Sequence, residues 1–216
     1  MDHGHFEKSV TQQVDFDYLM YHPRHTAFGE LPLILFLHGA GERGDDIELV
    51  KQHGPLKEIS EDADFPAIIV APQCPKGEWW NIEALYHFLE GICQQYAINR
   101  NKIYATGLSM GGYACWRMAC RYPELFAAIA PVCGGGDPES AHKLTHLPIW
   151  TFHGAKDDLV PLSETRKMVD AVKKNNKFRQ NNILFTIYSE TGHDSWSETY
   201  ANPELYRWIL RQKKTI

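Results

Sequence analysis

The chain has 216 residues, a hydrophobic fraction of 44%, a charged fraction of 23% and a formal net charge of −5 at pH 7. These values are typical of one folded domain with its own core, which we expect to span residues 1–216 with an N-terminal edge-strand region at residues 1–25. The negative charge argues against nucleic acid or an anionic membrane surface as the main partner.

Targeting and metal-binding signals are not evident in the sequence. The first residues are polar and lack the apolar core of a signal peptide, and no apolar run approaches the length of a membrane-spanning helix. We therefore expect a cytoplasmic protein without a membrane partner. Five cysteines occur at irregular spacings and form no C-x-x-C motif, so neither a zinc site nor a redox site is indicated: Cys74, Cys93, Cys115, Cys120 and Cys133.

The first half of the chain contains two runs typical of buried strands. Residues 8–22 alternate loosely between polar and apolar types and predict one or two strands at a sheet edge. Residues 31–37 and 65–71 are continuous apolar runs, which indicate strands buried on both faces. The loop at 38–44 is rich in glycine but lacks the Gly-Lys-Ser/Thr of a phosphate-binding loop. Residues 82–96 have the apolar spacing of a helix.

A strand, a tight turn and a helix follow each other at residues 102–117. The β-leaning residues 103–106 stop at Gly107, and a helical pattern starts after Met110. Between them lies Gly107-Leu-Ser-Met-Gly111, the G-x-S-x-G pattern of a nucleophile elbow. A serine on such a turn takes strained backbone angles, so its neighbours two residues away must be small. Ser109 is therefore the candidate nucleophile.

The remaining elements continue the alternation of strands and helices. They are predicted strands at 125–133, 148–152 and 183–188, a helix at 163–175 with Ser163 as its N-cap, and a terminal helix that contains residues 205–211. Alternating strands and helices predict a mostly parallel sheet with helices on both faces. In such sheets ligands bind beyond the carboxyl ends of the strands.

Candidates for a general base and its orienting carboxylate stand at two of these strand ends. Asp157 and Asp158 follow the strand at 148–152, and His193 follows the strand at 183–188. The chain order Ser, Asp, His is the order found in α/β-hydrolases. His193 would take the proton of Ser109 and return it to the leaving group, while a buried aspartate would hold the other ring nitrogen.

The chain resembles the small carboxylesterase/phospholipase and dienelactone-hydrolase-like serine esterases of the α/β-hydrolase superfamily. The matching segments run in family order: L-H-G-A-G-E-R-G-D (37–45), A-P-Q-C-P (71–75), G-L-S-M-G-G (107–112), H-G-A-K-D-D-L-V-P (153–161) and G-H-D-S-W (192–196). The resemblance implies the α/β-hydrolase fold. Residues 134–147 are too short and too polar for an apolar-faced helical lid, so we expect no cap domain.

The resemblance also assigns roles to individual residues. The family carboxylate falls on Asp157, with Asp158 as the alternative. The histidines of the two H-G turns, His38 and His153, would be structural. The backbone N–H groups of Ala40 and Met110 would form the oxyanion hole.

Aromatic residues gather at the predicted active edge. Trp80 and Trp196 are candidates for pocket walls, whereas Trp79 is as easily explained by loop packing. An open aromatic site without a lid favours short acyl or aryl groups over long lipid chains.

The hypothesis that follows is a serine esterase that cleaves small-molecule esters through an acyl-enzyme. We expect it to use neither metal nor cofactor and to act as a monomer or homodimer. The sequence leaves open an acyl-protein thioesterase or lysophospholipase-like activity, a serine peptidase activity, and a non-catalytic homologue that serves as a binding module.

Overall fold

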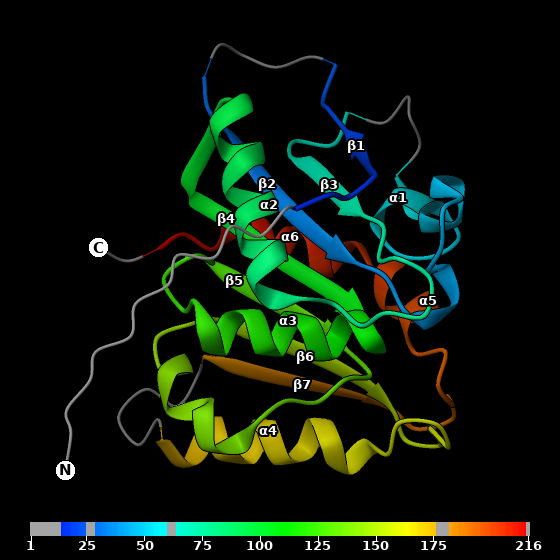
Figure 1. Ribbon diagram of the computed structural model, residues 1–216. Helices are drawn as coiled ribbons and strands as arrows, with labels where there is room; N and C mark the ends of the chain where they lie inside the picture. The colour runs from blue at the N-terminus through cyan, green and yellow to red at the C-terminus, as the bar shows by residue number, and fades with distance from the viewer. Residues whose placement is uncertain (1–13, 25–28, 60–63, 176–181, 215–216) are drawn as a thin grey trace, which may run out of the picture.

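The computed structural model describes residues 14–24, 29–59, 64–175 and 182–214, and shows one sheet between two layers of helices (Figure 1). The strands are β1 (Tyr18–Tyr21), β2 (Leu31–Leu37), β3 (Ile68–Pro72), β4 (Ile98–Leu108), β5 (Ala128–Val132), β6 (Ile149–Gly154) and β7 (Ile183–Tyr188). The α-helices are α1 (Pro55–Glu58), α2 (Ile82–Gln95), α3 (Met110–Arg121), α4 (Leu162–Asn175), α5 (Trp196–Tyr200) and α6 (Pro203–Arg211). Three 3₁₀ segments complete the set: η1 (Ala40–Glu42), η2 (Ile47–Lys51) and η3 (Pro138–Leu144).

The seven strands are ordered β1-β3-β2-β4-β5-β6-β7. Every neighbouring pair is parallel except β1 and β3, which are antiparallel. The parallel strands all point their carboxyl ends to one edge of the sheet. The prediction of a mostly parallel sheet with helices on both faces is confirmed.

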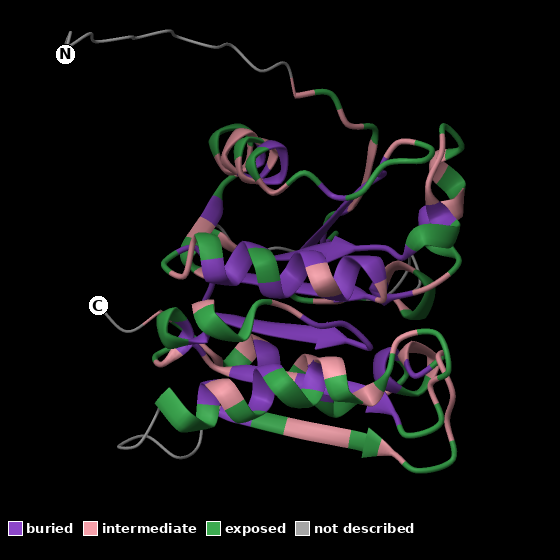
Figure 2. Ribbon diagram, turned by 60° about the horizontal axis from the view of Figure 1, so that its bottom comes forward, coloured by how far each residue is buried: buried purple, intermediate pink, exposed green. Residues whose placement is uncertain are grey.

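Two apolar layers hold the helices against the sheet. On one face the apolar residues of α2, α3 and α4 form one core layer with the sheet, which includes odd-numbered residues of β2 such as Leu33 and Leu35. On the other face α5, α6 and η2 pack against even-numbered residues such as Ile34 and Phe36. Figure 1 shows α2, α3 and α4 on the near side of the sheet with α6 behind it, and Figure 2 shows the middle of the sheet mostly buried. The central strands bury both faces, which explains their uninterrupted apolar sequence.

Several predicted boundaries shift. β4 starts at Ile98, before the predicted run at 103–106, and β5 starts at Ala128 instead of residue 125. The prediction that Ser163 caps a helix is wrong, because α4 already begins at Leu162. Of the N-terminal region 1–25, the structure contains β1, while residues 1–13 and 25 lie outside the described part.

The segment between β5 and β6 packs beside the sheet. Its central part is η3, whose Ala141 and Leu144 are fully buried against the layer that holds α4. This segment therefore forms part of the core, and no cap domain is found in the described residues. Within those same ranges, every helix falls short of the length and apolar character that crossing a bilayer requires.

The first turn of α3 touches the end of β2 so closely that only glycine fits there. A Cβ on Gly111 would lie 1.8 Å from the Leu37 carbonyl oxygen. We expect Gly111→Ala to lower the free energy of unfolding by at least about 2 kcal/mol, since the clash is with backbone. Gly91→Ala in α2 is the matched control, because its Cβ would meet nothing within 4 Å. Urea unfolding should show that Gly91→Ala raises the free energy of unfolding by about 0.5–1 kcal/mol. Equal stabilities of the two variants would contradict the packing described.

Candidate active site

The turn between β4 and α3 places Ser109 in a strained conformation above the sheet edge. Ser109 has φ 52° and ψ −115°, and it is the N-cap of α3. A Cβ on Gly107 would lie 2.5 Å from the Gly111 carbonyl oxygen, so the two glycines of the motif pack against each other. A positive φ on a serine is costly and persists only where surrounding packing enforces it. The sequence motif thus has the geometry of a nucleophile elbow.

The structure brings Ser109, His193 and Asp157 into one hydrogen-bonded chain. His193 Nδ1 lies 2.7 Å from Asp157 Oδ2, and His193 Nε2 lies 3.0 Å from Ser109 Oγ. A carboxylate can only accept, so Nδ1 donates to Asp157 and Nε2 is left to accept the Ser109 hydroxyl proton. This is the arrangement in which an imidazole acts as a base toward a serine.

The carboxylate in this chain is Asp157, and Asp158 is exposed beside it. Asp157 Oδ1 accepts the backbone N–H groups of Leu159 at 3.0 Å and Val160 at 2.8 Å. Burial alone would raise the pKa of Asp157. The hydrogen bonds from His193 and these N–H groups, with the charge of His193, outweigh it and hold that pKa below its ordinary value. The side chain is therefore an anion although none of it is exposed.

Two candidate oxyanion donors start neighbouring helical segments at the same edge. Ala40 is the first residue of η1, and Met110 is the first residue of α3. Backbone N–H groups in a first turn have no acceptor within their own helix. The close contact of Gly111 with the end of β2 holds the two segments together. Their N–H groups are therefore suited to receive a negatively charged oxygen formed next to Ser109.

His38 fixes the peptide that carries the Ala40 N–H. Its Nε2 accepts the backbone N–H of Cys74 at 2.9 Å, so its Nδ1 carries the proton and donates to the Gly39 carbonyl oxygen at 2.6 Å. In a trans peptide the Gly39 carbonyl and the Ala40 N–H point in opposite directions. The hydrogen bond that holds the Gly39 carbonyl therefore also fixes the direction of the Ala40 N–H.

The two tryptophans predicted at the pocket lie in different environments. Trp80 is only 3% exposed, and its indole N–H donates to the His38 carbonyl oxygen at 3.2 Å. Its position beneath the loop suits support of His38 better than direct contact with a substrate. Trp196 packs edge to face on His193, with ring centroids 5.1 Å apart, and it also contacts the ring of His53. Trp79 is 63% exposed.

One group in the described chain has the ligand types of a metal site, and it shares two residues, Asp157 and His193, with the hydrogen-bonded chain of Ser109. Ligand atoms of Cys133, Asp157 and His193 lie within 4.8 Å of one another. Burial raises the pKa of the Cys133 thiol to about 12, so this sulfur is protonated and a poor ligand. The Asp157 and His193 atoms already bond each other. These residues therefore suit proton transfer better than metal binding.

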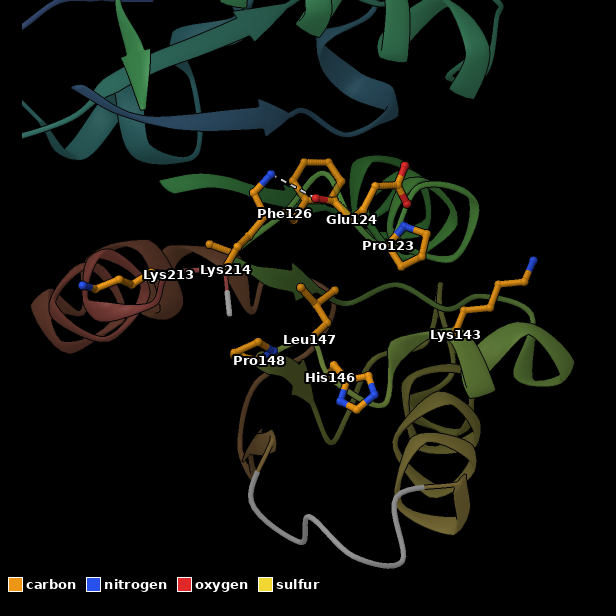
Figure 3. Close-up of a pocket in the computed structure, with 10 residues that line it drawn as sticks. Pro123, Glu124, Phe126, Lys143, His146, Leu147, Pro148, Lys213 and Lys214 are labelled. Carbon is orange, nitrogen blue, oxygen red and sulfur yellow. Dashed lines mark hydrogen bonds between the residues drawn. The ribbon is translucent and has the colours of Figure 1, made fainter. Parts of the chain in front are cut away.

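A separate groove of about 520 Å³ lies at the amino ends of β5 and β6, opposite the Ser109 edge (Figure 3). It is lined by Lys143, His146, Lys213 and Lys214 around an apolar floor that includes Phe126. Lys214 Nζ donates to the Glu124 carbonyl oxygen at 3.0 Å. The lining contains no hydroxyl or thiol side chain, whereas the hydroxyl of Ser109 lies at the other edge of the sheet.

The family profile described as Phospholipase/Carboxylesterase matches residues 81–202, which is more than half of the chain. The chain belongs to this family. The matched range contains Ser109, Asp157 and His193, whereas Ala40 precedes it. The resemblance read from the sequence is confirmed, and membership of the phospholipase/carboxylesterase family places the chain among the carboxylic ester hydrolases.

Individual relatives agree with this assignment. A probable feruloyl esterase C of Aspergillus niger is 24% identical over 200 residues, which cover 89% of this chain and 69% of that protein. The probable feruloyl esterase C of Aspergillus terreus is 27% identical and matches 69% of this chain and 55% of its own length. A thermostable esterase of known structure is 31% identical with a TM-score of 0.82, over 91% of this chain and 59% of that one. This chain is therefore shorter than all three.

A further solved structure, described as a phospholipase/carboxylesterase, shares only its fold with this chain. The Dyadobacter fermentans structure is 16% identical with a TM-score of 0.66, over 93% of this chain and 99% of that one.

Sequence reasoning missed two features of the site. Cys133 has φ 40° and, with Ser109, is one of the two non-glycine residues with positive φ in the described chain. Nothing in the segment A-P-V-C-G predicts that strain. The bonds of His38 to Cys74 and Gly39 were also missed, although the H-G pair marked the position. Its contact with Cys74 joins segments 36 residues apart, which no local pattern shows.

Burial of His38 should make the folded protein sensitive to acid. Burial lowers the pKa of His38 from 6.5 to about 4, so the unfolded chain binds this proton below about pH 6.5 and the folded chain does not. Stability is thus lost as pH falls from about 6.5 to about 4. We expect this residue to cost about 2 kcal/mol of unfolding free energy between pH 7 and pH 5.

Urea unfolding at the two pH values measures this loss. His38→Gln should be less stable than the wild type at pH 7, but its unfolding free energy should fall less between pH 7 and pH 5. The exposed control His142→Gln should show the same fall as the wild type. If the unfolding free energy of His38→Gln depended on pH as strongly as that of the wild type, protonation of His38 would not be the cause of the acid sensitivity.

Proposed function

We propose that this chain is a serine esterase that hydrolyses carboxylic esters through an acyl-enzyme formed on Ser109. The observation that carries the proposal is the hydrogen-bonded chain from Ser109 through His193 to Asp157, at the carboxyl edge of the sheet. Membership of the phospholipase/carboxylesterase family supports the reaction class. His193 acts as general base and then as general acid, and Asp157 holds its tautomer.

The reaction proceeds in two halves. Ser109 Oγ attacks the ester carbonyl carbon while its proton passes to His193 Nε2, and the protonated imidazole then gives that proton to the departing alcohol oxygen. Water, deprotonated by the same nitrogen, attacks the acyl-enzyme; the bond to Ser109 Oγ breaks, His193 returns the proton to Oγ, and the carboxylic acid is released. In both halves the negative oxygen of the tetrahedral intermediate lies against the N–H groups of Ala40 and Met110. No step draws on a metal or cofactor.

Short acyl or aryl esters are the substrate class that the site favours. The segment between β5 and β6 packs into the core as η3 and does not cover the edge that carries Ser109. Trp196, beside His193, offers an aromatic wall. Two relatives are named feruloyl esterases, which makes an aromatic acyl group a natural first candidate. A long acyl chain would leave most of its methylenes in water.

The prediction on substrate size is that acetyl to butyryl esters exceed esters of twelve or more carbons by at least about tenfold in kcat/KM, about 1.4 kcal/mol. The measurement is a panel of p-nitrophenyl esters of graded acyl length, an ester with an aromatic acyl group such as methyl ferulate, and matched thioesters. Ser109→Ala is the control and should lose at least about 10³ in kcat.

Two results would contradict the proposal in different ways. Turnover by Ser109→Ala close to the wild type would remove Ser109 as nucleophile. A preference for long-chain esters or thioesters would keep the mechanism but replace the substrate class with that of a lysophospholipase or acyl-protein thioesterase.

The two neighbouring aspartates should differ sharply in mutagenesis. Asp157→Asn should lower kcat by roughly 10³–10⁴, because an amide facing Nδ1 no longer enforces the tautomer that leaves Nε2 free. Asp158→Asn, on an exposed side chain, is the matched control and should change kcat by less than about twofold. Circular dichroism should show both variants folded. A larger loss in Asp158→Asn would mean that the carboxylate has been misassigned.

A further inference from the structure

We propose that His153, at the end of β6, is a positioning residue that weakens the basicity of His193 by sharing the oxygen of Asp157 to which His193 bonds. This inference rests on the proposed function, because it concerns the base of that reaction. His153 belongs to the H-G turn that the sequence marks as structural, and the mechanism above does not use it.

The position of His153 ties it to the triad. It is fully buried at the penultimate position of β6, and Asp157 follows in the tight loop beyond. A Cβ on Gly154 would lie 2.1 Å from the Gly192 carbonyl oxygen, so the loop of Asp157 and the loop of His193 are packed backbone to backbone. A substitution of His153 therefore acts at the place where the loops of Asp157 and His193 pack against each other.

The protonation of the inner ring nitrogen follows from its neighbours. His153 Nε2 lies 2.9 Å from the Val160 carbonyl oxygen, which can only accept, so Nε2 carries a hydrogen. The same nitrogen lies 3.1 Å from Asp157 Oδ2. Its N–H is thus bonded to the Val160 carbonyl, and the same partly positive N–H lies in contact with the oxygen that receives His193 Nδ1–H.

The opposite side of the ring is anchored to α4. His153 Nδ1 lies 2.7 Å from Thr165 Oγ1, and the Thr165 hydroxyl contacts the Gly134 carbonyl oxygen. Thr165 is fully buried. Turning the ring away from Asp157 would break the bond of Nε2 to the Val160 carbonyl and leave these buried polar atoms unpaired.

The electrostatic consequence has a definite sign. Oδ2 of Asp157 accepts the hydrogen bond of His193 and lies 3.1 Å from the N–H-bearing Nε2 of His153, and each partly positive group neutralises part of the charge that the other would feel. The N–H of His153 therefore weakens the attraction of Asp157 for a protonated His193. Burial lowers the pKa of His153 against the opposing effects of Val160 and Asp157, and any positive charge on this ring would act on His193 in the same direction.

Other titratable groups lie near Asp157 and His193, and they are the same in all the His153 variants compared below. They are Cys133 after β5, Tyr113 on α3, Glu164 on α4, and Asp194 in the loop of His193. The thiol of Cys133 is protonated across the relevant range, since its pKa is about 12. Asp194 is occupied by the N–H and hydroxyl of Ser197. The contact with Asp157 Oδ2 that the comparison changes is therefore that of His153.

A pair of substitutions separates this role from simple packing. The amide nitrogen of glutamine can reach the place of Nε2, so His153→Gln keeps a donor toward Asp157. Asparagine reaches only the place of Nδ1, so His153→Asn keeps the contact with Thr165 and loses that donor. The readout is the pH dependence of kcat/KM for a short aryl ester, whose acid limb reports protonation of the free enzyme's base.

We expect the acid limb of His153→Asn to move to higher pH by about half a unit or more, and that of His153→Gln to stay near the wild type. If the donor has no such role, both limbs coincide with the wild type whatever the loss of kcat, and the inference is overturned. The pH titration of the His193 ring, followed by NMR in a Ser109→Ala background, gives the same comparison without turnover. Should His153→Asn fail to fold, His153→Phe replaces it as the variant without a donor.

The same profiles distinguish failure of this inference from failure of the proposed function. A wild-type enzyme whose kcat/KM shows no acid limb does not use an imidazole base, and then the proposed function fails. A wild-type acid limb that His153→Asn does not move leaves the function in place and refutes only the role of His153.

Discussion

The close packing of the Ser109 turn against the end of β2 is the constraint on which the rest of the structure depends. There is no room for a side chain at Gly107 or Gly111, because backbone carbonyl groups of β2 and α3 occupy the place that a Cβ would take. This contact forces the positive φ of Ser109 and brings the first turn of α3 beside η1. One packing event therefore raises the hydroxyl above the sheet and sets the two candidate oxyanion donors side by side. The parallel sheet supplies the rigidity that holds the strain.

A second principle concerns how a buried carboxylate is kept charged. Asp157 is removed from water, which opposes ionisation, and two backbone N–H groups with two imidazoles compensate. The loop geometry that provides the N–H groups also fixes where His193 must lie. The same logic applies to His38, a buried ring whose two nitrogens are both paired. In each case the side chains hold the backbone of a loop, and the loop in turn aims the reacting groups.

The sequence was informative where the signal is local. The runs at 31–37 and 183–188 appear as β2 and β7 with unchanged bounds, because an apolar run between turn residues limits a strand on both sides. The fold class followed from alternation, and Ser109, His193 and Asp157 were brought together as the strand ends predicted. Features that depend on distant contacts could not be read in advance. Burial of Trp80 under His38, the strain at Cys133 and the sharing of Asp157 by two histidines arise only when separate loops meet.

The most direct test of the central claim is the mass of the enzyme during turnover. An aryl ester mixed with the protein and quenched in acid within the first turnovers should give a species heavier by one acyl group. Peptide mapping should locate that group on Ser109, and Ser109→Ala should give no such species. Hydrolysis at normal rates with no adduct, or with the acyl group on another residue, would contradict an acyl-enzyme on Ser109.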